Sequence, residues 1–272
     1  MLLCVAHDPK QSIFLQIAPA EKCRTPRSGT FKIPLLESER NDGTGNMAVD
    51  IDALTRFDLT PGEARQLQQR IRPLVIRRDR VGPVGRVAGA DMALREKTGY
   101  AAVIVYSFPE LQEVERAWIS DELKFPYVPG LLSFREIPLL LQAFGRLQRL
   151  PDLILADAHG WAHPRRAGLA CHLGIVLNTP TIGCAKSVLV GEYEMPDPAR
   201  GSISALHDGT DKIGVALRSR AGVRPIFVSC GHRVSLRTAV RLTLECCDGY
   251  RIPKPLREAD HFVKQLRSAL KQ

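Results

Sequence analysis

Apolar residues do not recur regularly in the first part of the chain. Residues 1–46 lack sustained apolar periodicity, and the stretch from Glu21 to Gly45 is crowded with Lys, Arg, Pro, Gly, Ser and Asn. A segment of this composition buries too little apolar surface to offset the entropy cost of folding. We therefore expect residues 1–46 to be a disordered N-terminal extension and residues 47–272 to form one domain, with Met47 as a candidate biological start.

A helical pattern begins at residue 60. Thr60 is predicted to be the N-cap, Pro61 the first helical residue and Glu63 the partner of Thr60 in a capping box. The apolar residues that follow share one helical face: Ala64, Leu67, Ile71 and Leu74.

From residue 86 the pattern becomes that of strands. Three short strand-like runs, residues 87–94, 100–107 and 114–119, are separated by turn-length gaps, which predicts an antiparallel meander. Helices and strands then alternate: a helix around residues 137–147, a strand over 153–156, a helix around 166–177, strands near 181–184, 213–217 and 226–230, and helices from 235 and 256. This order predicts one α/β domain, in which helices pack on a mixed sheet.

Composition and charge narrow the class of protein. The chain has 272 residues, of which 44% are hydrophobic and 25% charged, enough to build a sizeable core. Lysine and arginine exceed aspartate and glutamate by nine, which favours a polyanionic partner, with nucleic acid as the first candidate. No apolar run approaches the roughly 20 residues of a membrane span, and the first ten residues do not form a signal peptide. We expect a soluble, cytoplasmic protein.

The cysteines disfavour one kind of metal site. Seven cysteines are scattered along the chain without a C-x-x-C pair, so a zinc site with paired cysteine ligands is not predicted. Cys171, Cys184 and Cys246 lie in apolar segments, where a free cysteine acts as a small buried hydrophobe, and this usage indicates a reducing compartment.

Two aspartates stand in or just after apolar strands. Asp91 lies in the run VAGADMAL and Asp157 in LILADAHG. A carboxylate there is costly to bury unless a hydrogen-bond network or a metal offsets its desolvation, and a few converging carboxylates are the usual protein ligands of Mg²⁺. The alternative is structural: Asp157 opens a turn and Asp91 bonds a loop backbone.

Two neighbouring features have both a chemical and a structural interpretation. Glu136 is a third candidate carboxylate, but Ser133 and Glu136 also fit the S-x-x-E spacing of a capping box. The preceding segment, residues 126–130, holds Tyr127 between two prolines and before a glycine. Such a rigid apolar finger can enter a base stack and support an extruded nucleotide, although it can also be an ordinary loop.

The loop after Asp157 is basic. It carries His159, His163, Arg165 and Arg166, and the two arginines precede or enter a predicted helix, whose N-terminus attracts anions. This arrangement is compatible with phosphate binding. Two histidines this close could instead suggest zinc, but no cysteine or histidine pair at matching spacing completes such a site. Lys186 and His232 each follow a predicted strand and are either site residues or solvated loop residues.

Taken together, these motifs resemble the endonuclease V family, the deoxyinosine-directed nucleases of the ribonuclease H-like superfold. Five segments carry the resemblance in the family's order: residues 87–91, 126–136, 157–160 with 163–166, 181–186, and 231–235. The resemblance covers the chain from about Leu54 to the last predicted helix. It implies a ribonuclease H-like mixed sheet, with the antiparallel meander followed by alternating helices and strands.

The resemblance also implies roles for particular residues. Asp91, Glu136 and Asp157 match the acidic residues that hold catalytic Mg²⁺ or Mn²⁺. Lys186 matches the lysine near the scissile phosphate and His232 the histidine near the attacking water and metal. The remaining matches are a strand-separating wedge (Pro126, Tyr127, Val128 and Pro129) and a hypoxanthine pocket (Gly130, Leu132 and Ala158). Ala158 stands where the family usually has glycine and adds a methyl group beside that pocket.

The activity implied by the resemblance is hydrolysis of the second phosphodiester bond 3′ to deoxyinosine in DNA, for repair of deaminated adenine. The products are 3′-hydroxyl and 5′-phosphate ends. An inosine-specific ribonuclease is the nearest alternative, because a tolerated 2′-hydroxyl is not readable from the sequence. An inactive inosine-binding protein is another alternative, which the three retained carboxylates disfavour. We expect inosine-containing DNA or RNA as partner, no membrane association, and a monomer.

Overall fold

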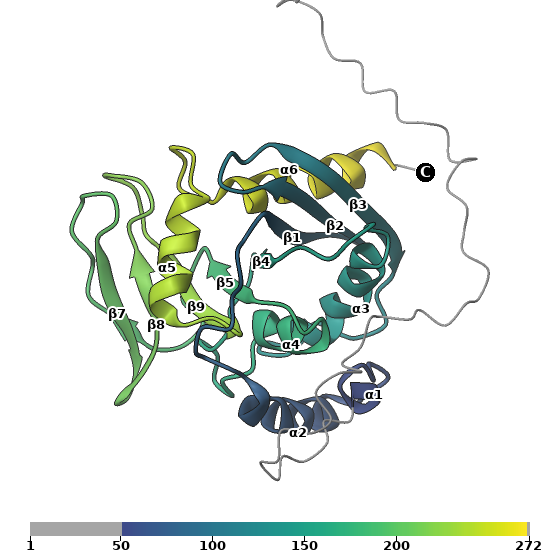
Figure 1. Ribbon diagram of the computed structural model, residues 1–272. Helices are drawn as coiled ribbons and strands as arrows, with labels where there is room; N and C mark the ends of the chain where they lie inside the picture. Colours follow the sequence, from purple (N-terminus) through teal and green to yellow (C-terminus); the bar gives the residue numbers. More distant parts are fainter. Residues whose placement is uncertain (1–50, 271–272) are drawn as a thin grey trace, which may run out of the picture. The chain divides into compact units, whose positions relative to one another are not determined.

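The computed structural model describes residues 51–270, and the predictions for residues 1–46 and Met47 lie outside that range. The described chain contains a nine-stranded mixed sheet in the order β3-β2-β1-β4-β5-β9-β8-β7-β6 (Figure 1). The strands, in chain order, are β1 (Arg86–Arg95), β2 (Thr98–Ser107), β3 (Glu113–Glu122), β4 (Leu153–Ala156), β5 (Thr181–Ala185), β6 (Glu192–Tyr193), β7 (Ile203–Asp208), β8 (Asp211–Leu217) and β9 (Ile226–His232). The predicted α/β fold is confirmed.

The strand directions follow the predicted plan. β1, β2 and β3 pair antiparallel in sequence order, which confirms the meander. β4 then pairs parallel with β1, and β5 parallel with β4, because a helical crossover precedes each of these two strands. β9 runs antiparallel to β5, so its last residue lies beside the first residue of β5.

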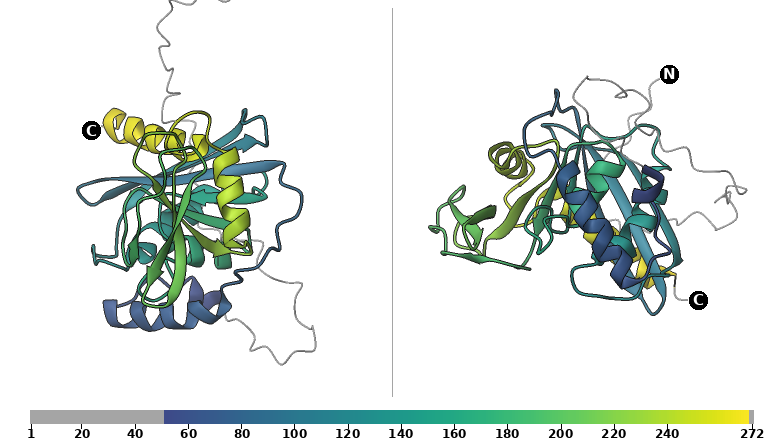
Figure 2. Two further views of the ribbon diagram at one scale, coloured as in Figure 1. Left: turned by 90° about the vertical axis from the view of Figure 1, so that its left-hand side faces the viewer. Right: turned by 90° about the horizontal axis from the view of Figure 1, so that it is seen from below.

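Helices cover both faces of the central strands (Figures 1 and 2). On one face α3 and α4 pack against the sheet, and α1 and α2 pack on α4; α5 and α6 cover the other face. The helices are α1 (Ile51–Leu54), α2 (Pro61–Ile71), α3 (Leu132–Phe144), α4 (Leu169–Val176), α5 (Leu236–Glu245) and α6 (Lys254–Ala269). Successive side chains of β1 and β2 alternate between these two cores, as the pleat of a strand requires.

The two predicted capping boxes have different outcomes. The first is confirmed: the Glu63 backbone N–H donates to Thr60 Oγ1 at 3.3 Å, and the Thr60 N–H donates to the Glu63 carboxylate at 2.8 Å. The second does not form, because the N-cap of α3 is Leu131 and Ser133 lies inside the helix with its hydroxyl buried. Glu136 is therefore not held in a capping box.

The sheet has two strands that the sequence pattern did not reveal. β6 has only two residues, and the side chains of β7 lack a regular apolar alternation. The helix predicted around residues 166–177 is also shorter, since α4 begins after its N-cap Gly168 and Arg166 has a φ of +54°.

Helix α6 approaches β1 very closely. A Cβ placed on Gly89 in the middle of β1 would lie 2.1 Å from the carbonyl oxygen of Pro255, so only glycine permits this packing. The contact fixes the N-terminal half of α6 directly over the strand that carries Asp91.

Two further expectations concern the cysteines and membrane spans. Cys171, Cys184 and Cys246 are buried and unpaired, as predicted for small core residues. Over the residues that the structure describes, there is no helix both long enough and apolar enough to cross a bilayer.

Candidate active site

Three aspartate side chains converge where β4 ends. The pairing of β1 with β4 ends at Ala90 and Ala156. Asp91 and Asp157 are the residues that directly follow these two. One carboxylate oxygen each from Asp91, Asp157 and Asp260 lies within 4.8 Å of the other two. Asp91 and Asp157 therefore lie on neighbouring segments of the sheet, close enough to share an ion.

Asp260 was not identified from the sequence. It comes from α6, whose N-terminal half is held on β1 at Gly89. The signal that could have found it is its position between Leu256 and Val263, four residues after one and three before the other, on the apolar face of an amphipathic helix. A carboxylate in such a row is unusual unless it has a partner.

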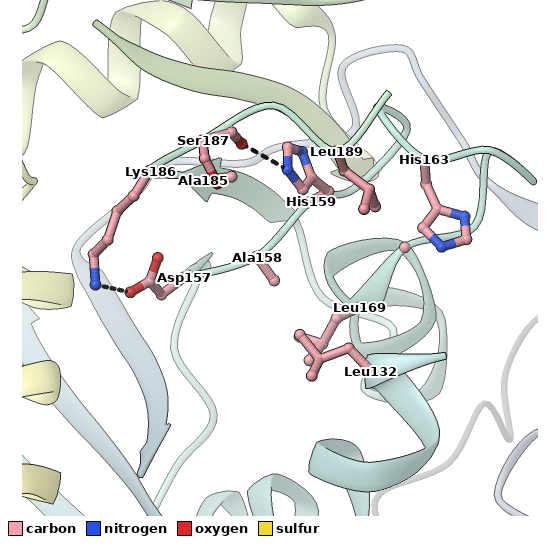
Figure 3. Close-up of a pocket in the computed structure, with 11 residues that line it drawn as sticks. Leu132, Asp157, Ala158, His159, His163, Leu169, Ala185, Lys186, Ser187 and Leu189 are labelled. Carbon is pink, nitrogen blue, oxygen red and sulfur yellow. Dashed lines mark hydrogen bonds and ion pairs between the residues drawn. The ribbon is translucent and has the colours of Figure 1, made fainter. Parts of the chain in front are cut away.

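Two lysines neutralise part of this acidic group. The Lys186 ammonium, at the end of β5, hydrogen-bonds the Asp157 carboxylate (Figure 3) and reaches Asp260 Oδ1 at 3.3 Å. Lys264, one turn after Asp260 on α6, donates to Asp260 Oδ2 at 2.6 Å. Burial would raise the pKa of Asp260, but these hydrogen bonds and charges hold it below the usual value.

The remaining carboxyl groups have raised pKa values. Burial and then the neighbouring Asp157 charge raise the pKa of Asp91 to about 7. Burial raises the pKa of Asp157 too, although Lys186 opposes this effect. Glu136, on α3, lies outside the group of three converging carboxylates. Burial and the charges of Asp91 and Asp157 raise the pKa of Glu136 to about 8.

This donor set fits a divalent cation. Several carboxyl groups share a poorly solvated site, where their mutual repulsion makes ionisation costly in the absence of a cation. Oxygen donors without cysteine or histidine ligands suit the hard ions Mg²⁺ and Mn²⁺. The ion itself is part of the proposal below.

A cavity of about 260 Å³ lies beside Asp157. Leu132, Ala158 and Leu169 form an apolar part of its wall, and Lys186 stands next to Asp157 at its edge (Figure 3). Of the predicted pocket residues, Leu132 and Ala158 line this cavity, whereas Gly130 does not. The Gly130 carbonyl instead accepts hydrogen bonds from Gln68 and Arg165.

The predicted wedge is an exposed loop between β3 and α3. The Tyr127 side chain is 72% exposed, the largest exposed fraction among the large hydrophobic residues that the structure describes. The loop closes with a hydrogen bond from the Leu131 N–H to the Val128 carbonyl at 2.9 Å, and Gly130 adopts a φ of +78°. A protruding ring on a short, closed loop is compatible with the predicted role.

The predicted phosphate-binding residues are engaged with the protein. Buried Arg166 pairs with Asp208 at 2.9 Å and Asp211 at 3.3 Å, so its charge is largely neutralised. His163 is also buried, and its Nε2 lies 3.0 Å from the Gly130 carbonyl. These contacts support structural roles for both residues.

His232 lies away from the aspartates. It pairs with Thr181 at the start of β5, whereas Lys186 follows the end of that strand, roughly 15 Å further along. Its ring is buried, and its Nδ1 lies 3.4 Å from the Ile76 backbone nitrogen. Burial lowers the pKa of His232 to about 3, so the ring is neutral. The expected proximity of His232 to the metal ligands is wrong.

A row of exposed arginines lies on α2 and in the segment that follows it. Its members are Arg65, Arg70, Arg72, Arg77, Arg78 and Arg80, and none of them forms an ion pair within residues 51–270. Arg77 and Arg72 lie over the Trp161 ring, 4.0 Å and 6.0 Å from its centroid. Unpaired positive charge beside an aromatic ring is typical of a surface that binds a polyanion.

Comparison with known proteins shows the family of the chain. Residues 66–261 match the model of the endonuclease V family. The chain belongs to the endonuclease V family. Endonuclease V of Roseiflexus castenholzii is 48% identical over 206 residues, which cover 76% of this chain and 93% of that protein.

Solved endonuclease V structures share the fold. The Streptomyces avermitilis endonuclease V superposes with a TM-score of 0.76 at 43% identity, covering 79% of this chain and 96% of that one. A Ciona intestinalis endonuclease V, solved with a 24-mer DNA that contains an inosine followed by a ribo-adenosine, has a TM-score of 0.68 at 27% identity. It covers 77% of this chain and 98% of its own. The predicted endonuclease V membership and ribonuclease H-like fold are confirmed.

Proposed function

We propose that this protein is a divalent-metal-dependent endonuclease that cleaves DNA at the second phosphodiester bond 3′ to deoxyinosine. The products have 3′-hydroxyl and 5′-phosphate ends, and the reaction serves repair of deaminated adenine. The observation that carries the proposal is the convergence of Asp91, Asp157 and Asp260 beside a cavity in an endonuclease V chain. The inosine-containing DNA of the Ciona relative supports the choice of lesion.

The metal is proposed to be Mg²⁺, with Mn²⁺ able to replace it. Asp91, Asp157 and Asp260 would hold it, with Glu136 as a further acidic partner. A bound divalent ion supplies Lewis acidity, lowers the pKa of water and offsets the charge that develops on the phosphate. This role accounts for an acidic group inside a protein with a net charge of +9.

The chain's own residues bind and orient the substrate. The Lys186 ammonium, between Asp157 and Asp260, brings a positive charge to the position proposed for the scissile phosphate. Leu132 and Ala158 offer an apolar wall to the extruded base. The exposed Tyr127 ring would fill the gap that the base leaves. Inosine pairs weakly, so its extrusion costs less than that of a normal base.

One assay tests the proposal. Single- and double-stranded DNA and RNA oligonucleotides, each with one inosine or with adenine at the same position, are incubated with Mg²⁺, with Mn²⁺ or with EDTA. We expect one cut at the stated bond in inosine DNA, its loss in EDTA, and no cut in the adenine control. Cleavage confined to RNA would make the protein an inosine-specific ribonuclease, and binding without cleavage would make it a binding protein.

A further inference from the structure

A glutamine on α2 is buried and fully hydrogen-bonded. Gln68 is 1% exposed, whereas Gln66 and Gln69 on the same helix are exposed. A buried amide is costly unless each polar atom finds a partner. The Gln68 amide therefore needs its hydrogen bonds in the folded protein.

These hydrogen bonds join three distant segments. Gln68 Nε2 donates to the Gly130 carbonyl at 3.0 Å and to the Ala167 carbonyl at 3.2 Å. Its Oε1 accepts from Arg165 Nε at 2.5 Å. Carbonyl oxygens only accept and a guanidinium only donates, so a single orientation of the amide satisfies all three partners. α2 is thereby tied both to the loop with Tyr127 and to the loop after β4.

The Gly130 carbonyl is the point where these contacts meet. Besides Gln68, it accepts from the Arg165 terminal nitrogen at 2.8 Å and lies 3.0 Å from His163 Nε2. A Cβ on Gly130 would lie 2.9 Å from that Arg165 nitrogen, and the φ of +78° also favours glycine. Only two residues separate this anchored carbonyl from Tyr127, whose own side chain is mostly exposed.

We propose that Gln68 is a positioning residue: it holds the wedge loop, residues 126–130, in a fixed place relative to the cavity beside Asp157. The inference rests on the proposed function. The cavity wall includes His163 and Gly168, which belong to the same loop as the Ala167 carbonyl that Gln68 binds. A loop that is already ordered loses less conformational entropy when it engages DNA, so Gln68 would strengthen binding without touching the substrate.

Two substitutions separate the contacts of this amide. Gln68→Met keeps a similar length but removes all three hydrogen bonds, and Gln68→Glu keeps the acceptor for Arg165 but removes both N–H donors. Gln69→Met changes an exposed glutamine on the same helix and is the matched control. We expect Gln68→Met to weaken inosine-DNA binding about tenfold and Gln68→Glu to weaken it too. Binding to undamaged DNA should change little, and Gln69→Met should behave as wild type.

A double-mutant cycle tests whether Gln68 affects inosine-DNA affinity by positioning Tyr127. If Gln68 acts by positioning the loop, Gln68→Met should have almost no further effect on inosine-DNA affinity in a Tyr127→Ala background. A tenfold loss that persists in that background would overturn the proposal, since it would mark Gln68 as a general structural residue. An unchanged preference for inosine in both Gln68 variants would overturn it as well.

Amide hydrogen exchange in the free protein provides a test without substrate. Gln68→Met and Gln68→Glu should speed exchange in residues 126–131, including the Leu131 N–H, relative to Gln69→Met. Unchanged exchange in this segment would overturn the positioning role whatever the activity. A wild-type protein without inosine preference would contradict the proposed function instead, so the two failures are distinguishable.

Discussion

At the scale of single residues, the proposed metal site predicts that Asp91 and Asp157 matter for cleavage rather than for the stability of the fold. Asp91→Asn and Asp157→Asn each remove one metal ligand but leave the basic surface in place. We expect cleavage of inosine DNA to fall at least about a hundredfold, with affinity measured by titration largely retained. The exposed Asp197→Asn is the control and should cleave normally. Equal losses of affinity and cleavage would indicate a structural role.

The raised pKa values of Asp91 and Glu136 predict how stability depends on pH. Their folded pKa values are about 7 and about 8, whereas unfolded carboxyl groups titrate near 4. In this range the folded state therefore binds more protons than the unfolded state, so the stability of the metal-free protein falls as pH rises toward 8. Melting temperatures between about pH 7 and pH 8 should decrease without metal. The stabilisation by Mg²⁺ should grow over the same range.

Glu136→Gln is the control variant for this measurement, because it removes one titrating group from the site. Its metal-free melting temperature should depend less on pH than that of wild type. The buried histidines act in the opposite direction: they are neutral in the folded protein, with pKa values of about 3 to 4, whereas unfolded histidines titrate near 6.5, so their effect fades above about pH 7. A wild-type slope identical to that of Glu136→Gln would show that this carboxyl does not titrate in the window.

For Tyr127 we predict that a substitution weakens binding to inosine DNA without lowering the stability of the folded protein. If its ring stacks in the gap left by the extruded base, Tyr127→Ala should lose roughly 1–3 kcal/mol of binding to inosine DNA. The melting temperature should change little, because the side chain is 72% exposed. Lesion-DNA affinity, undamaged-DNA affinity and melting temperature are measured together. A large drop in melting temperature with an unchanged lesion preference would make Tyr127 a packing residue.

The sequence identified the strand carboxylates but not the whole site. Asp91 and Asp157 were visible because a charge interrupts an apolar strand, whereas Asp260 is one acidic residue on a helix rich in charges. The error at His232 has a geometric cause. The sequence shows that a residue follows a strand, but not in which direction that strand runs. β9 runs antiparallel to β5, so His232 at the end of β9 lies beside the start of β5, whereas Lys186 follows the end of β5.

At the scale of helices and strands, the apolar pattern identified the buried strands and the helices that have one buried face. The meander, the buried strand β4 and the amphipathic helix α3 all lie close to their predicted positions. β6 and β7 were missed because they lie at the sheet edge, where few of their side chains are buried and the apolar pattern is weak. Neither strand carries one of the carboxyl groups of the site.

The close approach of α6 to β1 predicts a coupled loss of stability and metal affinity. Gly89→Ala would force the added methyl against the Pro255 backbone and displace α6, which carries Asp260. We expect a destabilisation of roughly 1–3 kcal/mol, the usual cost of overpacking, and weaker Mg²⁺ binding by calorimetry. Gly82→Ala has open space around its new Cβ and should change neither quantity. Normal metal affinity in Gly89→Ala would show that Asp260 does not depend on this packing.

At the scale of the whole molecule, we predict that residues 1–46 are dispensable. Their composition offers no core, and the match to the endonuclease V family begins at residue 66. A chain that begins at Met47 should have the melting temperature of the full chain and cleave inosine DNA at the same rate. Loss of either property would show that the N-terminal residues contribute to the folded, active protein.

The site is assembled from residues far apart in the chain, and its last member arrives late in synthesis. A polypeptide that has grown as far as Lys186 already contains Asp91, Glu136 and Asp157, but it lacks Asp260 and the helix that carries it. Because Asp260 belongs to the proposed metal-binding group, a chain without α6 would lack one of the three converging carboxylates.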